Sequence, residues 1–243
     1  MCDKNFEAIF NKLCYTHDTS TVWTDFLNYC IDQFLINPDK KYFDTERYTV
    51  KEQEYFNQLF GAWILRMDKK LEDHEYYDFL GEFYENIIIS RYKAGNKGQF
   101  FTPMDVASCM AELTYTNNDK KDDKEGHVCY DCTCGSGRTL LAWHNLRPQD
   151  RCIGWDLDVQ AAKMCVLNFI VHGIRGSVVW CNSLSYEFFD AWKVHEFPFT
   201  VMSVDSFGES ECFIGQDNNR ESVVNVHQEA GSMQSTLIEV FIV

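Results

Sequence analysis

The stretch Asp131-Cys-Thr-Cys-Gly135-Ser-Gly137 decides the fold class, because it joins a short apolar segment to a helix through two closely spaced glycines. Residues 127–130 before it predict a β-strand, and residues 137–146 predict the helix that follows. Glycines at such a junction let the backbone approach a ligand at the helix N-terminus. We therefore expect a nucleoside cofactor to bind at this turn.

Strands and helices alternate in the residues after the turn. The sequence predicts strands at residues 151–155, 177–181 and 199–204, with a helix at residues 159–172. This alternation is typical of βαβ units, which build a parallel sheet. Ligands of such sheets bind outside the carboxyl ends of the strands. We therefore interpret residues 127–182 as the cofactor half of a Rossmann-like α/β domain.

Acidic or amide side chains close three successive predicted strands. Asp131 would repel a dinucleotide pyrophosphate, but its carboxylate suits the cationic ammonium of a methionyl group. Asp156 can accept hydrogen bonds from ribose hydroxyls, and Asn182 can bond the edge of an adenine. Leu140 stands where a dinucleotide-binding loop would carry its third glycine. These features favour S-adenosylmethionine over NAD.

The residues before this domain predict helices. No glycine occurs between Met1 and Phe60, and apolar residues recur there at helical spacing. Residues 73–89 predict one more amphipathic helix. A further helix is expected at residues 103–113, with Thr102 as its N-cap. We expect an N-terminal helical domain at residues 1–92 and the α/β core at residues 93–243.

The net charge and the cysteines argue against two classes of protein. The formal net charge is −15, whereas a protein that grips DNA by itself needs a lysine- and arginine-rich surface. The 11 cysteines are odd in number and scattered, which indicates free thiols in a reducing compartment. No stretch has the layout of a membrane span or a signal peptide. We therefore expect a cytoplasmic protein.

A zinc cluster is the alternative for the residues around the glycine turn. It would use His127, Cys129, Cys132 and Cys134. The Cys-x-x-Cys half crosses a strand end, and no second pair lies at ligand spacing. We therefore predict no metal site.

Four short motifs together resemble the N6-adenine DNA methyltransferases, most closely the modification subunits of type I restriction systems. They are Gly98-Gln-Phe-Phe-Thr102-Pro103, Asp131-Cys-Thr-Cys-Gly135-Ser-Gly137, Gly154-Trp-Asp156 and Asn182-Ser-Leu184. The resemblance covers about residues 92–184 and implies an S-adenosylmethionine-dependent methyltransferase core. It also implies that Phe101 and Thr102 cover the methionyl end of the cofactor. The cofactor residues expected from pattern and resemblance are Gln99, Phe100, Phe101, Thr102, Pro103, Asp131, Gly135, Ser136, Gly137, Asp156 and Asn182.

The motif that would carry catalysis departs from the family. Enzymes of this family hold a flipped adenine with Asp or Asn, two prolines and an aromatic residue after the fourth strand. This chain has Asp205-Ser-Phe207 there, and its four prolines include no adjacent pair. By resemblance, Asp205 would accept the amino hydrogens of the base and Phe207 would stack on it. Family members usually have Asp at the position of Asn182.

Three functions remain open from the sequence. The first is methylation of adenine N6 in DNA within a restriction–modification system, in which a separate specificity subunit reads the DNA. The second is a degenerate module that binds cofactor or a partner and transfers nothing. The third is a methyltransferase for protein or RNA. Because only 35 residues follow Gly208, the core is expected to be short or incomplete, or to be completed by a protein partner.

Overall fold

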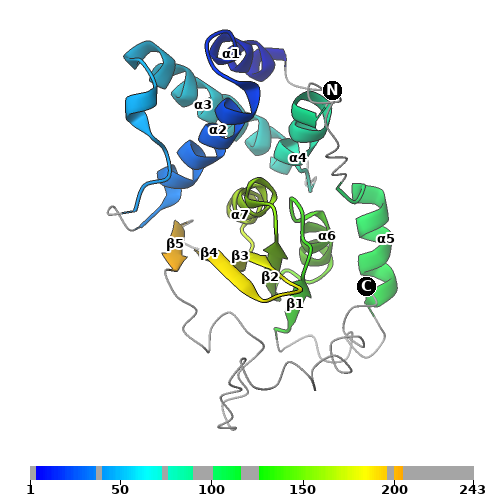
Figure 1. The fold of residues 1–243 in the computed structure, drawn as a ribbon. Helices are drawn as coiled ribbons and strands as arrows, with labels where there is room; N and C mark the ends of the chain where they lie inside the picture. Colours follow the sequence, from blue (N-terminus) through cyan, green and yellow to red (C-terminus); the bar gives the residue numbers. More distant parts are fainter. Residues whose placement is uncertain are drawn as a thin grey trace.

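Five strands form one mixed sheet in the computed structural model, which describes residues 4–36, 40–72, 76–89, 101–115, 126–195 and 200–204. The strands are β1 (Val128–Asp131), β2 (Arg151–Asp156), β3 (Gly176–Asn182), β4 (Glu187–His195) and β5 (Thr200–Val204). Their order in the sheet follows the sequence. The first three strands are parallel, and β4 is antiparallel to both β3 and β5. The chain therefore has an α/β fold with a mixed sheet (Figure 1).

The β4 strand shows that the prediction of a parallel sheet was wrong beyond β3. Only residues 183–186 separate β3 from β4, whereas a parallel connection needs a dozen or more residues. The chain must therefore turn back on itself, with Tyr186 at a φ of 59° in the turn. The strand predicted at residues 199–204 exists as β5, but it lies at the opposite end of the sheet from β1.

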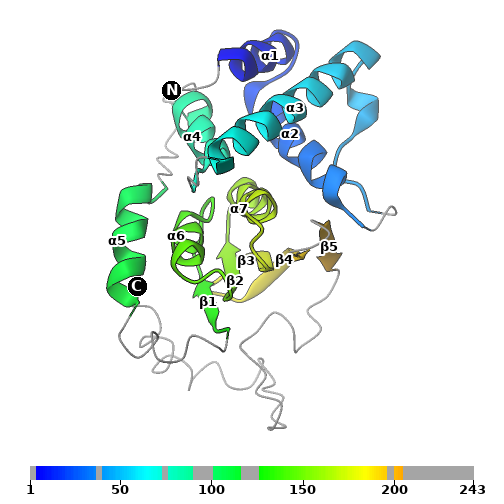
Figure 2. The ribbon, with the colours of Figure 1, turned by 180° about the vertical axis from the view of Figure 1, so that it is seen from behind.

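Helix α7 (Val159–His172) lies between the sheet and the N-terminal helices (Figures 1 and 2). Asp158 caps its start by accepting hydrogen bonds from the backbone N–H groups of Gln160 and Ala161. Gly173 ends the helix in the left-handed conformation, at a φ of 69°. Ten of its residues are buried, from Ala161 to Ile170, and eight of them are apolar, as expected for a helix that is enclosed on most sides.

The other helices surround α7 and the sheet. They are α1 (Lys4–Cys14), α2 (Thr19–Phe34), α3 (Val50–Glu72), α4 (Phe79–Phe83), α5 (Met104–Thr114) and α6 (Arg138–Leu146), with short helical turns η1 (Thr45–Arg47) and η2 (Tyr84–Ile89). The helix predicted at residues 73–89 therefore begins later, at Phe79, and η2 continues it as a π-helix. Helix α5 has Pro103 as its N-cap without a side-chain bond, so the predicted cap by Thr102 was wrong.

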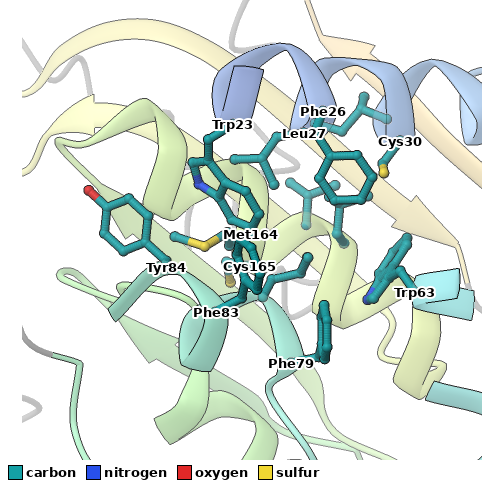
Figure 3. Packing of buried hydrophobic residues seen from close by; sticks show 14 of the residues in the cluster. Trp23, Phe26, Leu27, Cys30, Trp63, Phe79, Phe83, Tyr84, Met164 and Cys165 are labelled. Carbon is teal, nitrogen blue, oxygen red and sulfur yellow. The ribbon is translucent and has the colours of Figure 1, made fainter. Parts of the chain in front are cut away.

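One hydrophobic cluster joins the N-terminal helices to α7. Figure 3 shows Trp23 and Phe83 beside Met164 and Cys165. The rings of Trp23 and Phe83 are stacked, with centroids 5.4 Å apart. The predicted boundary between residues 92 and 93 stays a prediction, because residues 90–100 lie outside the described ranges.

The described ranges contain no disulfide and no helix suited to cross a membrane. The nine cysteines of these ranges are free, and Cys30, Cys134, Cys152, Cys165 and Cys181 are buried. Within the same ranges, no helix combines the length and the apolar character that a membrane crossing requires.

Candidate functional site

The glycine turn between β1 and α6 forms one wall of the candidate site. Gly135 has a φ of +56° and Gly137 a φ of +91°, a region that other residues rarely adopt. A Cβ atom on Gly135 would lie 2.7 Å from the Phe101 ring, and one on Gly137 would lie 2.8 Å from Sγ of Cys165. Both positions therefore require glycine, for backbone conformation and for space.

Asp131 lies at the end of β1, at the mouth of this turn. Its Oδ1 accepts the backbone N–H of Thr133 at 2.9 Å, and its Oδ2 accepts the hydroxyl of Thr139. An ionised carboxylate has about four acceptor positions, so these two bonds leave capacity for a ligand. The two bonds also fix the orientation of the carboxylate. Asp131 can therefore present a negative charge to a cationic group.

Asp156, at the end of β2, connects this strand to the turn. Its Oδ2 accepts the N–H of Gly135, and its Oδ1 accepts the N–H of Asp158, both at 2.8 Å. Burial raises the pKa of the Asp156 carboxyl, and the two amide hydrogen bonds oppose that rise. The side chain thus holds the glycine turn in place while it faces the same cavity as Asp131.

The cavity beside the turn has a volume of about 230 Å³. This is slightly below the usual range for small-molecule sites, roughly 300–1,000 Å³, so it suits one part of a nucleoside cofactor better than the whole. The residues that line it are Phe101, Thr102, Asp131, Thr133, Cys134, Gly135, Ser136, Arg138, Thr139 and Asp156.

Phe101 and Thr102 form a second wall of the cavity, next to the turn. The Phe101 side chain is buried, and its ring lies 5.5 Å from the guanidinium of Arg138. Nη1 of Arg138 also donates to the carbonyl oxygen of Thr102 at 3.4 Å. The first residue of α6 therefore connects the two walls.

A buried polar network lies behind the turn and is centred on Asp78. This carboxylate accepts hydrogen bonds from Oγ of Ser136 at 2.5 Å, Nε of Arg138 at 2.7 Å and Nδ2 of Asn168 at 2.8 Å. The side chain of Asp78 is 1% exposed. A buried charge is tolerated only when it is paired and hydrogen-bonded, and Asp78 meets both conditions. The network ties the start of α4 to the glycine turn and to α7.

His172 attaches the same segment to α7. The backbone N–H of Tyr77 donates to its Nε2 at 3.3 Å, so Nδ1 carries the proton and donates to the carbonyl of Asn168 at 2.8 Å. The ring of Tyr76 stacks on the imidazole, with centroids 5.5 Å apart. Burial lowers the pKa of His172 below 6.5 and, with nearby His144, outweighs the raising effects of the Asn168 carbonyl and Asp78.

The free energy of unfolding is expected to decrease as the pH is lowered, because the pKa of His172 is depressed in the folded protein. Its stabilising contribution is complete above the unfolded pKa of 6.5 and is lost as the pH falls through that value towards the lower folded pKa. The decrease should occur as the pH is lowered from about 7.5 to about 5.5, and urea titrations at several pH values can measure it. His172→Gln should flatten this part of the profile. An equally steep profile in that variant would assign the pH dependence to other groups.

The structure brings some of the predicted site residues together. Gly137 is the N-cap of α6, and Pro103 is exposed at the start of α5. Asn182 is not among the residues that line the cavity, and its amide oxygen accepts the N–H groups of Leu184 and Ser185 in the turn after β3. The predicted residues that line the cavity are Phe101, Thr102, Asp131, Gly135, Ser136 and Asp156. Gln99, Phe100, Asp205 and Phe207 lie outside the described residues.

The zinc alternative and the buried ion pairs of Arg138 can also be compared with the sequence-based predictions. Within the described residues, no group of three or more His, Cys, Asp or Glu could hold a metal ion. Asp78, Glu85 and Arg138 were not predicted from the sequence; Arg138 pairs with the two carboxylates across more than 50 residues. An arginine directly after Gly137 was the available signal, because a charge at the start of a buried helix needs a partner.

The comparisons with known proteins match methylases or methyltransferase subunits. A family model described as N-6 DNA Methylase matches residues 75–232. The methylase subunit of the type I restriction enzyme MpnII from Mycoplasma pneumoniae is 31% identical over 105 residues, which are 40% of this chain and 18% of that subunit. This chain thus spans about a fifth of the length of that relative. A crystal structure of a type I restriction–modification methyltransferase subunit from Streptococcus thermophilus is 22% identical, covers 70% of this chain and 36% of its own, and has a TM-score of 0.33.

Proposed function

Since this chain belongs to the N-6 DNA methylase family, we propose that it binds S-adenosylmethionine in the cavity beside the glycine turn and serves the methylation of adenine N6 in DNA. The observation that carries the proposal is the pair of fixed carboxylates, Asp131 and Asp156, on the two sides of a turn that tolerates only glycine at Gly135. The setting would be a restriction–modification system. The architecture proposed with it is a Rossmann-like core at residues 93–243 behind a helical domain at residues 1–92.

The residues around the cavity fit this cofactor chemically. Asp131 would receive the ammonium of the methionyl group, and Asp156 would accept hydrogen bonds from the ribose hydroxyls. Gly135 leaves room for the Phe101 ring, which packs against the turn and lines the cavity with it. Asn182 uses its amide oxygen in the turn, so its NH₂ group is the part proposed to meet the adenine. When bound, the cofactor supplies the methyl group on its sulfonium.

The proposed catalytic residues follow β5. In the sheet, Val204 of β5 lies level with Ala191 of β4, which lies level with Val179 of β3. The last residue of β5 is therefore three residues short of Asn182, the last residue of β3. We propose that Asp205 accepts the amino hydrogens of the target adenine and that Phe207 stacks on the base. The net charge of −15 makes a separate DNA-reading subunit part of the proposal, because such a partner can supply the phosphate contacts.

The proposal predicts which carboxylates the cofactor needs. Asp131→Asn and Asp156→Asn should each weaken the binding of S-adenosylmethionine by about 10- to 100-fold, as expected for the loss of one or two charge-assisted hydrogen bonds. Calorimetric titration measures this directly. Asp105→Asn is the matched control, because Asp105 is exposed on α5 and does not line the cavity. Unchanged affinity in both cavity variants would remove this site from the account.

Methyl transfer tests the rest of the proposal. Labelled S-adenosylmethionine is incubated with unmethylated DNA, with and without a candidate specificity subunit, and the label on adenine is measured. Incorporation at adenine supports the methyltransferase. Binding of the cofactor without any transfer, even with the partner present, supports the second candidate, a module that holds cofactor only. The lack of adjacent prolines after β5 favours that candidate.

A further inference from the structure

Glu85 contacts both walls of the cofactor cavity without lining it. Its Oε1 accepts the backbone N–H of Phe101 at 2.9 Å, and its Oε2 accepts Nη2–H of Arg138 at 2.8 Å. Phe101 belongs to one wall, and Arg138 directly follows the glycine turn that forms the other. One carboxylate in η2 therefore links two segments that are separate in the sequence.

Arg138 provides a fixed point for this link. Its Nε donates to the buried carboxylate of Asp78, and its own side chain is only 10% exposed. The guanidinium also lies over the Phe101 ring, whose Cδ1 would be 2.7 Å from any Cβ at position 135. The ring and the turn are thus in contact, and both line the cavity.

The charge of Arg138 does not by itself require Glu85, because Asp78 already balances it. The contact that Asp78 cannot replace is the one between Glu85 and the N–H of Phe101. Glu85 is 23% exposed, so it lies at the border of the network and not at its centre. It also lies in a π-helix, a distortion that often occurs at functional sites.

We propose that Glu85 is a positioning residue that holds the Phe101–Thr102 wall against the glycine turn and so keeps the cavity at the width that S-adenosylmethionine needs. The consequence for the cofactor rests on the proposed function. The positioning of the wall itself rests only on the contacts of Glu85.

Two variants separate the contacts of Glu85. Glu85→Gln keeps an amide oxygen that can accept the N–H of Phe101 but loses the charge that faces Arg138. Glu85→Ala loses both contacts. We expect the affinity for S-adenosylmethionine in calorimetry to fall by about tenfold in the alanine variant and by less than about threefold in the glutamine variant. Glu112→Ala, exposed on α5, is the control and should bind like the wild type.

Amide hydrogen exchange distinguishes positioning from a general loss of structure. The N–H of Phe101 should exchange about tenfold faster or more in Glu85→Ala, because its acceptor is gone. The N–H of Tyr42 is a matched reference, since it donates to the carboxylate of Asp32 at 2.9 Å and neither residue lines the cavity. Its exchange rate should not change.

The outcomes decide the two proposals separately. Unchanged exchange of the Phe101 amide in Glu85→Ala, or equal acceleration at Phe101 and Tyr42, would overturn the positioning role. A faster Phe101 amide with wild-type affinity would overturn its effect on the cofactor. A wild-type chain that binds no S-adenosylmethionine would overturn the proposed function, while the exchange measurement would still decide whether Glu85 holds the wall.

Discussion

Asp78→Ala is expected to lower the free energy of unfolding by about 3–5 kcal/mol, as for other buried ion pairs that lose one partner. The substitution removes the acceptor of Ser136, Arg138 and Asn168 at once. Arg138 would keep Glu85 as a partner, but its Nε would be buried without an acceptor. Urea titration followed by circular dichroism measures the change.

The control for Asp78 is an acidic residue without these contacts. Asp105→Ala removes an exposed carboxylate on α5 and should change the free energy of unfolding by less than about 0.5 kcal/mol. Asp78→Asn should fall between the two, because it keeps the shape and one acceptor oxygen. A loss below about 1 kcal/mol for Asp78→Ala would contradict the structural role of the network.

Gly176→Ala should destabilise the sheet by about 3 kcal/mol or more. A Cβ at this position would overlap the carbonyl oxygen of Cys152, the residue with which Gly176 pairs in β2, and would approach Cε2 of Phe169 to 3.1 Å. Both neighbours are buried, and one of the clashing atoms belongs to the backbone. The clash can therefore be relieved only if β2 and β3 move apart at this position.

Gly61→Ala is the matched comparison for this prediction. Gly61 lies inside α3, and a Cβ there would meet no atom within 4 Å. The alanine variant should be more stable than the wild type by about 0.5–1 kcal/mol, from helix propensity alone. Thermal and urea unfolding of the two variants should give shifts of opposite sign. A shift of the same sign in both would show that local space does not control these positions.

Local signals predicted much of the edge of the sheet that borders the cavity. The bounds of α7 follow from its cap by Asp158 and its glycine stop at Gly173, and the helix ends where the sequence predicted. The places of Asp131 and Asp156 follow in the same way from the ends of two short apolar segments. These features depend on residues that are close together in the sequence.

The features that the sequence did not predict depend on contacts between distant residues or on short connections. β4 carries charged residues among its apolar ones, so no alternating pattern marked it, and the turn at residues 183–186 sets its direction. Asn182 closes β3 as predicted, but the bonds of its amide oxygen to the turn that leads into β4 were not predicted. The pairing of Asp78 with Arg138 joins residues 60 positions apart and requires the folded structure to be seen.

Calorimetric titration of the chain with S-adenosylmethionine and, in parallel, with NAD tests directly which cofactor the cavity binds. We expect binding of S-adenosylmethionine and none of NAD, because the carboxylate of Asp131 attracts an ammonium and repels a pyrophosphate. Asp131→Asn should remove most of this preference. Binding of NAD, or no binding of either cofactor, would overturn the assignment of the cavity to S-adenosylmethionine.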